Sequence, residues 1–167
     1  MSKYYILFCI LFFSCNSKTA KQEQELLKPK MSIIQKHNSI VLLENSSKNY
    51  VANWTEYQSV NEHLKKFSSI SANEALNNAL KLSDLVKLLK DSIRPEELIN
   101  LPFRTRINVL DNEALRLKDM TFIPAITANE VTAQVEKIIA AFSATNSKIN
   151  TVYTQLEVEK DLKNNLN

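Results

Sequence analysis

Cys15 is the residue with the most distinctive chemical context in this sequence. It stands in the stretch LFFSCNSK, residues 11–18, where an apolar run ends at a small residue and the chain turns polar. Its thiol could be a core group, half of a disulfide with Cys9, a free thiol, or a point of lipid attachment. Which of these holds decides where the protein works.

The two histidines do not form a metal-binding pattern. A metal site needs several converging ligands, and neither His37 nor His63 has a His-x-x-x-His or Glu-x-x-His spacing. We therefore expect His63 to lie on the surface of its helix, His37 to lie in a polar, mobile region, and the protein to hold no metal or other cofactor.

The acidic residues do not suggest a catalytic dyad. Three pairs stand close in sequence: Glu96 with Glu97, Asp111 with Glu113, and Glu157 with Glu159. The first pair suits a helix N-terminus, and residues two apart on a helix do not face one another. We expect all of them to face water, and we expect the protein not to be an enzyme.

Five residues form the candidate interaction surface, because aromatic and arginine side chains often carry binding energy at interfaces. They are Trp54, Tyr57, His63, Arg104 and Arg106. The alternative for the two aromatic residues is core packing, since they lie on the apolar face of their helix. The alternative for the two arginines is a face turned to water. A further alternative is a small-molecule or metal-binding pocket between helices near the first three.

Residues 1–14 have the parts of a secretory signal peptide. Lys3 supplies the positive n-region, residues 4–13 form a ten-residue apolar h-region, and Ser14 is small, as a cleavage site needs. Ten helical residues reach only about 15 Å, which is half of the roughly 30 Å hydrocarbon core of a bilayer. The sequence therefore predicts a leader and not a membrane-spanning helix.

The residues before Cys15 resemble the lipobox of bacterial lipoproteins. Leu11-Phe12-Phe13-Ser14-Cys15 departs from the lipobox at Phe12, where Leu, Val or Ile is commoner. The short leader rich in Phe and Ile before Ser14-Cys15 is similar to the flavobacterial type, in which the motif is looser. The resemblance covers about the first 20 residues, and the helical part is similar to small uncharacterised lipoproteins. It implies that the leader is cut before Cys15 and that this cysteine carries a lipid. Cys9 would leave with the leader, so no disulfide would remain.

The next residues predict a tether and a location. Residues 15–32 are polar and charged, which favours a flexible tether. Asn16 after the cysteine, and the lack of an acidic cluster there, resemble lipoproteins held in the outer membrane and facing the periplasm. We expect two kinds of contact: the membrane through the lipid on Cys15, and a protein partner or a second copy. We expect no contact with nucleic acid.

Composition limits both fold and chemistry. The chain has 167 residues and no glycine, so glycine-rich phosphate loops and dinucleotide fingerprints are excluded. A β-sandwich is disfavoured, because glycine supplies the tight turns of such folds. The formal net charge is +3, and loss of Lys3 leaves 20 basic against 18 acidic residues. This balance gives no indication of nucleic-acid binding.

Helical periodicity dominates residues 33–167, which we expect to form one helical-bundle domain. Helices are predicted over about 48–67, 71–93, 103–120 and 127–163, whereas 33–49 is ambiguous. A short helix should open at Pro95, and Pro102 should interrupt the chain again. The fold class is all-α: an elongated antiparallel bundle of three to four helices with a long C-terminal helix, which could pack within one chain or against a second copy.

Two helix beginnings share a capping box, in which a Ser or Thr and a Glu three residues later satisfy each other's amides. The motifs are Ser71 with Glu74 and Thr127 with Glu130. They could record a duplication, or both could simply be good helix starts.

Apolar stripes follow both motifs. On the 71–93 helix Leu76, Leu80, Leu85 and Leu88 widen the stripe, which reaches Ile93, so burial on two sides is expected. Thr145 interrupts the last stripe and could set register or bond back to the Ala141 carbonyl.

Overall fold

The computed structural model describes residues 30–166. Cys15, the predicted signal peptide and most of the predicted tether lie outside the described residues. The elements, in chain order, are β1 (Ile34–Lys36), α2 (Asn45–Val51), α3 (Thr55–Lys65), η1 (Lys66–Ser68), β2 (Ser69–Ser71), α4 (Ala72–Asp91), η2 (Glu96–Leu98), α5 (Leu101–Met120) and α6 (Ala128–Asn165).

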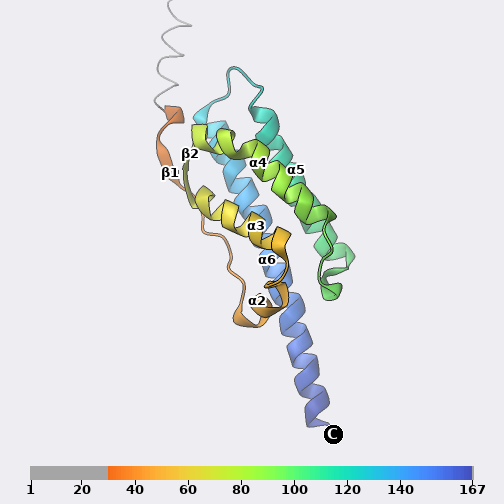
Figure 1. Ribbon diagram of the computed structural model, residues 1–167. Helices are drawn as coiled ribbons and strands as arrows, with labels where there is room; N and C mark the ends of the chain where they lie inside the picture. The colour runs from red at the N-terminus through yellow and green to blue at the C-terminus, as the bar shows by residue number, and fades with distance from the viewer. Residues whose placement is uncertain (1–29, 167) are drawn as a thin grey trace, which may run out of the picture.

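The described chain is an elongated antiparallel helical bundle with a long C-terminal helix, as the periodicity predicts. Figure 1 shows α4, α5 and α6 running alternately up and down, with α3 crossing α4 on the side away from α5. Helix α5 packs extensively against both α4 and α6. The 38 residues of α6 make it the longest element, and at about 1.5 Å per residue it is nearly 57 Å long.

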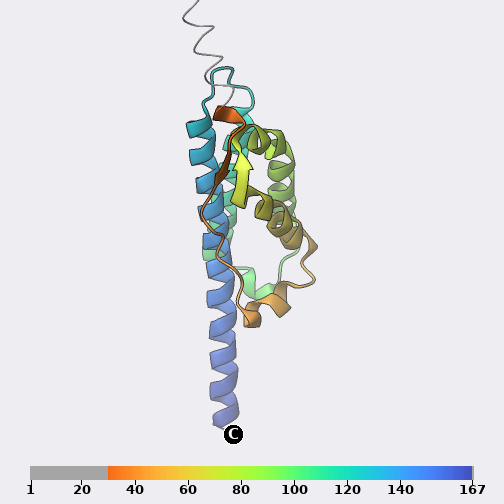
Figure 2. The ribbon, with the colours of Figure 1, turned by 90° about the vertical axis from the view of Figure 1, so that its left-hand side faces the viewer.

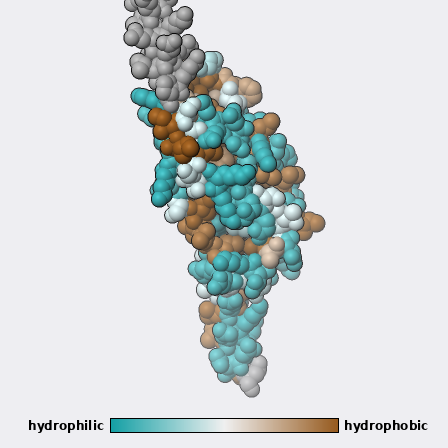
Figure 3. All heavy atoms as spheres, turned by 60° about the vertical axis from the view of Figure 1, so that its left-hand side comes forward, coloured by the Kyte–Doolittle hydropathy of each residue, from teal (hydrophilic) through white to brown (hydrophobic). Residues whose placement is uncertain are grey.

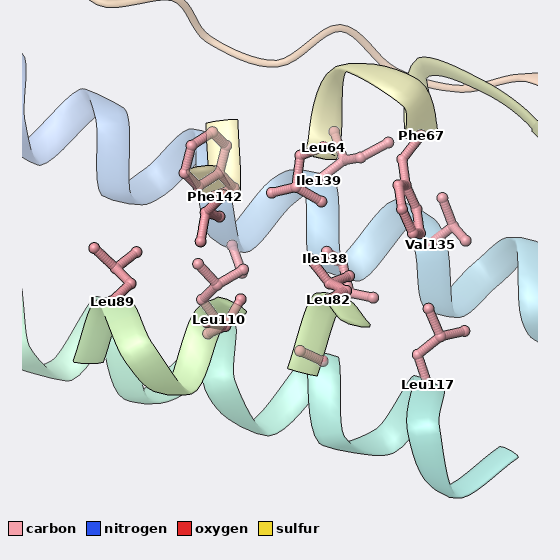
Figure 4. Close-up of a cluster of buried hydrophobic side chains, with 14 of the residues drawn as sticks. Leu64, Phe67, Leu82, Leu89, Leu110, Leu117, Val135, Ile138, Ile139 and Phe142 are labelled. Carbon is pink, nitrogen blue, oxygen red and sulfur yellow. The ribbon is translucent and has the colours of Figure 1, made fainter. Parts of the chain in front are cut away.

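The core is formed by apolar side chains from four helices. Figure 4 shows Leu64 of α3, Leu82 of α4, Leu110 of α5 and Phe142 of α6 directed toward one another. The predicted stripe of α5 is buried along its whole length: Phe103, Ile107, Leu110, Ala114 and Leu117.

The polar interruption in the stripe of α6 is resolved within the helix. The Thr145 hydroxyl is fully buried and donates to the Ala141 carbonyl at 3.0 Å.

Two helices begin at the capping boxes that the sequence predicts. The Ser71 hydroxyl accepts the amide of Glu74, and the Glu74 carboxylate accepts the amide of Ser71. Thr127 and Glu130 repeat this arrangement at the start of α6. Helix α5 begins two residues before the predicted position, because Asn100 caps it and Pro102 fits its first turn instead of interrupting it.

The predicted helix over 48–67 is wrong, because the chain forms two helices there. Helix α2 packs on α6, whereas α3 packs on α4. The chain turns between the two helices at residues 52–54. Trp54 leaves the helical conformation there, with φ −86° and ψ 86°.

The expectation that α4 is buried on two sides is also wrong. Leu80 and Leu88 are exposed, and Leu76 and Leu85 are only partly buried. Helix α4 ends at Asp91, so the last member of the predicted stripe, Ile93, lies beyond it and is 97% exposed. Helix α4 therefore buries one face, against α3 and α5.

The ambiguous segment 33–49 contains a strand, an extended stretch and a helix. Strand β1 pairs antiparallel with β2, with Ile34 opposite Ser71 and Lys36 opposite Ser69. Residues 37–44, which we name the strap, then run along α6 to the start of α2 (Figure 2). The amide of His37 still donates to the Ser68 carbonyl at 2.9 Å. The rest of the strap is not paired with a strand, so its main-chain groups need other hydrogen-bonding partners.

Side chains of α6 supply partners for the first half of the strap. Glu136 accepts from His37 Nδ1 at 2.9 Å and from the amide and side chain of Asn38. Ser143 Oγ accepts the amide of Val41 at 3.1 Å. His37 is buried by this contact, so its predicted place in a mobile polar region is wrong.

Two asparagines of α6 hold the second half of the strap. Asn146 donates to the Val41 carbonyl at 2.7 Å. Asn150 donates to the Leu42 carbonyl at 3.0 Å and accepts the Glu44 amide at 2.9 Å. The strap is thus attached to α6 as a strand is attached to a sheet, but with side chains in place of a second main chain.

The C-terminal part of α6 projects beyond the bundle (Figures 1 and 2). Residues 157–166 are all exposed. Among residues 30–166, no helix combines the length and the apolar character required to cross a bilayer.

Candidate functional site

Three residues of the candidate interaction surface lie inside the bundle. Trp54, Tyr57 and His63 are all buried in the single chain. The prediction that they offer a surface to a partner is therefore wrong, and the alternative of core packing is confirmed for the two aromatic residues. The polar groups of Trp54 and Tyr57 bond to residues in other parts of the fold.

Trp54 connects the turn after α2 to the end of α4. Its indole nitrogen donates to Ser92 Oγ at 2.8 Å, and Ser92 Oγ in turn donates to the Leu89 carbonyl. Its ring lies 6.0 Å from that of Phe103 on α5. Trp54 thus holds the start of the α4–α5 connector in place at Ser92.

Tyr57 connects α3 to the strap through Asn146 of α6. Its hydroxyl donates to Asn146 Oδ1 at 2.9 Å, and burial raises the pKa of this phenol well above its ordinary value. The phenol therefore stays protonated and acts as a donor. The Nδ2 group of Asn146 donates to the Val41 carbonyl. A single buried amide therefore joins α3, α6 and the strap.

His63 is buried between α3 and α4, and not on the surface as predicted. Burial, followed by the charges of Lys81 and Lys66, lowers the pKa of its imidazole, and a hydrogen bond with the backbone of Asn78 opposes this shift. Its Nε2 has no hydrogen-bond partner within residues 30–166. The ring lies 5.7 Å from that of Phe67.

Acid should therefore destabilise the fold through His63. Because its folded pKa is lowered, the unfolded chain binds more protons below about pH 6.5, so the free energy of unfolding falls as the pH drops through this window. Urea unfolding at about pH 7.5 and about pH 5.5 measures the fall, before most carboxylates titrate near pH 4. The His63→Phe variant should show a smaller fall, and an identical fall in both proteins would contradict the prediction.

Contrary to the expectation from sequence, the acidic pair Asp111 and Glu113 does not simply face water. Asp111 is buried and forms an ion pair with Lys90 at 2.6 Å, which joins α4 to α5. Glu113 accepts from the Gln134 side chain at 2.8 Å, which joins α5 to α6. Both carboxylates have a structural role, because each one bonds to a side chain of a neighbouring helix.

The two predicted arginines differ in their surroundings. Arg106 donates to the Pro102 carbonyl of its own helix at 2.8 Å. Arg104 is exposed and lines a hollow of about 410 Å³ at the connector between α4 and α5. Figure 1 shows this connector at the end of the bundle opposite to the start of the described chain.

We name this surface the distal patch: Ile93, Arg94, Ile99, Leu101 and Arg104. Its three aliphatic side chains are 97%, 70% and 65% exposed, in chain order. Sequence analysis did not identify these three residues as a surface. Ile93 fits the apolar stripe predicted for the 71–93 helix, and Ile99 and Leu101 lie between the predicted breaks at Pro95 and Pro102. The signal that could have found them is a run of large apolar residues outside any helical stripe.

Local hydrogen bonds hold the distal patch in shape. Asn100 Oδ1 accepts the Phe103 amide at 2.9 Å and its amide group donates to the Glu97 carbonyl, while Arg94 donates to the Lys90 carbonyl. Leu98, on the same connector, is fully buried. Its neighbours on the connector are thereby directed outward on a fixed backbone.

The distal patch is chemically suited to binding and not to bond making. Its hollow is lined by aliphatic side chains, two guanidinium groups, Ser92 and Asn100, with no carboxylate, histidine or cysteine. Within residues 30–166 no three metal-ligating side chains gather to hold an ion.

A second hollow lies between the strap, α2 and α3. Its volume is about 480 Å³, and its lining combines Leu42, Leu43, Val51 and Tyr57 with the polar side chains of Lys48, Gln58, Asn61, Glu62 and Lys65. Of the three residues expected near a pocket between helices, it includes Tyr57 only. Trp54 lies at the α4–α5 connector, and His63 borders a different hollow with Lys66 and Lys81.

Comparison with protein-family models, with curated proteins and with solved structures finds no match to this chain. Its function therefore has to be inferred from its own residues.

Proposed function

We propose that this chain is a lipid-anchored, non-enzymatic interaction protein of the bacterial cell envelope that binds a partner protein through its distal patch. Cys15 in its lipobox-like context would supply the anchor, and the outer membrane facing the periplasm is the location that Asn16 suggests. The helical bundle would present the binding surface at a fixed distance from its anchored end.

The observation that carries this proposal is the exposure of Ile93, Ile99 and Leu101 around one hollow. Single exposed apolar residues are ordinary, but a cluster of large ones on a rigid backbone is typical of a protein-binding site. Arg94 and Arg104 border the cluster, and arginine is enriched in interfaces because it packs and donates at once.

The lining indicates the chemistry of the partner surface. Two guanidinium groups without a neighbouring carboxylate in the hollow favour acidic groups on the partner. The aliphatic side chains favour apolar ones. We therefore expect a partner segment in which apolar residues alternate with Asp or Glu.

Site-specific photo-cross-linking in the native cells tests this proposal. A photoreactive amino acid at position 99 should give one recurrent adduct, whereas the same group at position 80, an exposed leucine on α4, should not. Arg104→Glu should reduce the adduct about tenfold or more, the loss that corresponds to about 1.4 kcal/mol at an interface arginine. Equal adducts at both positions would contradict a specific site.

Arg106→Glu is the matched control for Arg104→Glu. Both changes reverse one charge on the same helix, but Arg106 does not line the hollow. It should therefore leave the adduct unchanged. An equal loss in both variants would mean a general charge effect and would overturn the assignment of the patch.

A second candidate function, a small-molecule-binding module, is favoured by the hollow between the strap, α2 and α3. Its volume is in the range of ligand pockets, and it combines apolar and polar lining residues. Cross-linking that yields no partner at position 99 would favour this candidate.

A further inference from the structure

Apolar side chains are also exposed at the opposite end of the bundle. Phe122 is 77% and Ile123 48% exposed, in the connector between α5 and α6. Ile33 and Ile34, at the start of the described chain, are exposed to a similar degree. Figures 1 and 2 both place the connector and the first described residues at the same end, and Figure 3 shows hydrophobic side chains next to the start of the described chain.

The connector holds its apolar residues outward on a defined backbone. The amide of Phe122 donates to the Asp119 carbonyl and that of Ile123 to the Met120 carbonyl, which continue the last turn of α5. The amide of Ile126 then closes a turn on the Ile123 carbonyl. The exposed position of Phe122 is therefore fixed by main-chain hydrogen bonds.

The position of Cys15 limits how far this end can lie from a membrane. Fourteen residues, 16–29, separate Cys15 from Lys30. Even a fully extended chain of this length spans only about 50 Å. With a lipid on Cys15, the start of the described chain lies within about 50 Å of the bilayer. The distal patch lies roughly 30 Å from the end that carries Phe122, along the 20 residues of α5.

We propose that Phe122 and Ile123, together with Ile33 and Ile34, form a membrane-contacting surface that inserts into the interface of the lipid bilayer. This inference rests on the lipid anchor of the proposed function. Aromatic and aliphatic side chains at the headgroup boundary gain from burial there. The domain would then stand upright on the bilayer, with the distal patch directed away from it.

Lipid quenching of tryptophan fluorescence tests the contact. The full-length lipidated protein is reconstituted into vesicles of phosphatidylethanolamine and phosphatidylglycerol with brominated acyl chains. Phe122→Trp should show blue-shifted emission that the brominated lipid quenches. Ile99→Trp, on the distal patch, is the matched control and should remain unquenched. The wild-type protein gives the background, because its single tryptophan, Trp54, is buried.

The outcomes separate this inference from the proposed function. The intact mass of the purified protein shows whether Cys15 carries a lipid, and a mass without lipid would overturn the anchor and the contact together. A lipidated Phe122→Trp protein without quenching would overturn the contact alone. A blue shift that depends on protein concentration and not on lipid would assign this surface to a second copy, and would also overturn the proposal.

Discussion

The Phe142→Ala variant should lose about 3–5 kcal/mol of its free energy of unfolding, the range found for large aromatic residues in protein cores. Phe142 is fully buried in the middle of α6, and its ring stacks on that of Tyr57 with 5.8 Å between centroids. Figure 4 shows it among side chains of α4 and α5. Alanine would leave a cavity where four helices meet, which the rigid packing cannot close.

Urea unfolding followed by circular dichroism measures this loss. Leu162→Ala is the matched control, because Leu162 lies on the same helix beyond the bundle and is exposed. The control should change stability by less than about 0.5 kcal/mol. A loss below about 1 kcal/mol for Phe142→Ala would contradict the packing of α6 against the other helices.

The Asn146→Leu variant should lose about 2–3 kcal/mol, although leucine has a similar size. The change removes the acceptor of the Tyr57 hydroxyl and the donor to the Val41 carbonyl. A buried group left without its partner costs about 1–3 kcal/mol, and the Tyr57 side chain is such a group because its residue is 1% exposed. Hydrogen exchange of residues 37–44 should accelerate as the strap detaches.

A double-mutant cycle with Tyr57→Phe separates this hydrogen bond from other effects. Tyr57→Phe should destabilise the wild-type protein but should be neutral or stabilising in the Asn146→Leu background, because no unpaired hydroxyl then remains. Ser147→Ala is the control: Ser147 is exposed and bonds only to its own helix. Additive losses in the cycle would contradict the coupling between α3 and the strap.

Local signals predicted the bundle well. The stripe of α5 from Phe103 to Leu117 and both capping boxes are present as expected. These features depend on residues three or four apart on one helix, so the sequence contains all the information they require. The long last helix follows from the same kind of signal.

Features that depend on distant residues were not predictable in this way. The break at residues 52–54 separates α2, which packs on α6, from α3, which packs mainly on α4, and periodicity does not reveal the packing partner. The strap is held by Asn146 and Asn150, which read as ordinary polar positions until the segment that they bind is known.

The same distinction, between local signals and contacts of distant residues, applies to the candidate site. Arg104 was found from its type, but the apolar members of the distal patch were assigned to a stripe or passed over. Trp54, Tyr57 and His63 were considered as surface groups because their hydrogen-bond partners and neighbours lie on other elements. Residue type alone therefore gave candidates, and tertiary packing decided which of them reach the surface.

The attachment of the strap to α6 also sets a time order for folding. The bonded residues of the two segments are separated by 98 to 110 positions. During synthesis, which runs at about 5–20 residues per second, residues 37–44 are made many seconds before most of their partners. Pairings of such long sequence separation form slowly, because loop closure precedes any gain. The strap therefore cannot attach to α6 until its partners, up to 110 positions later in the chain, have been made.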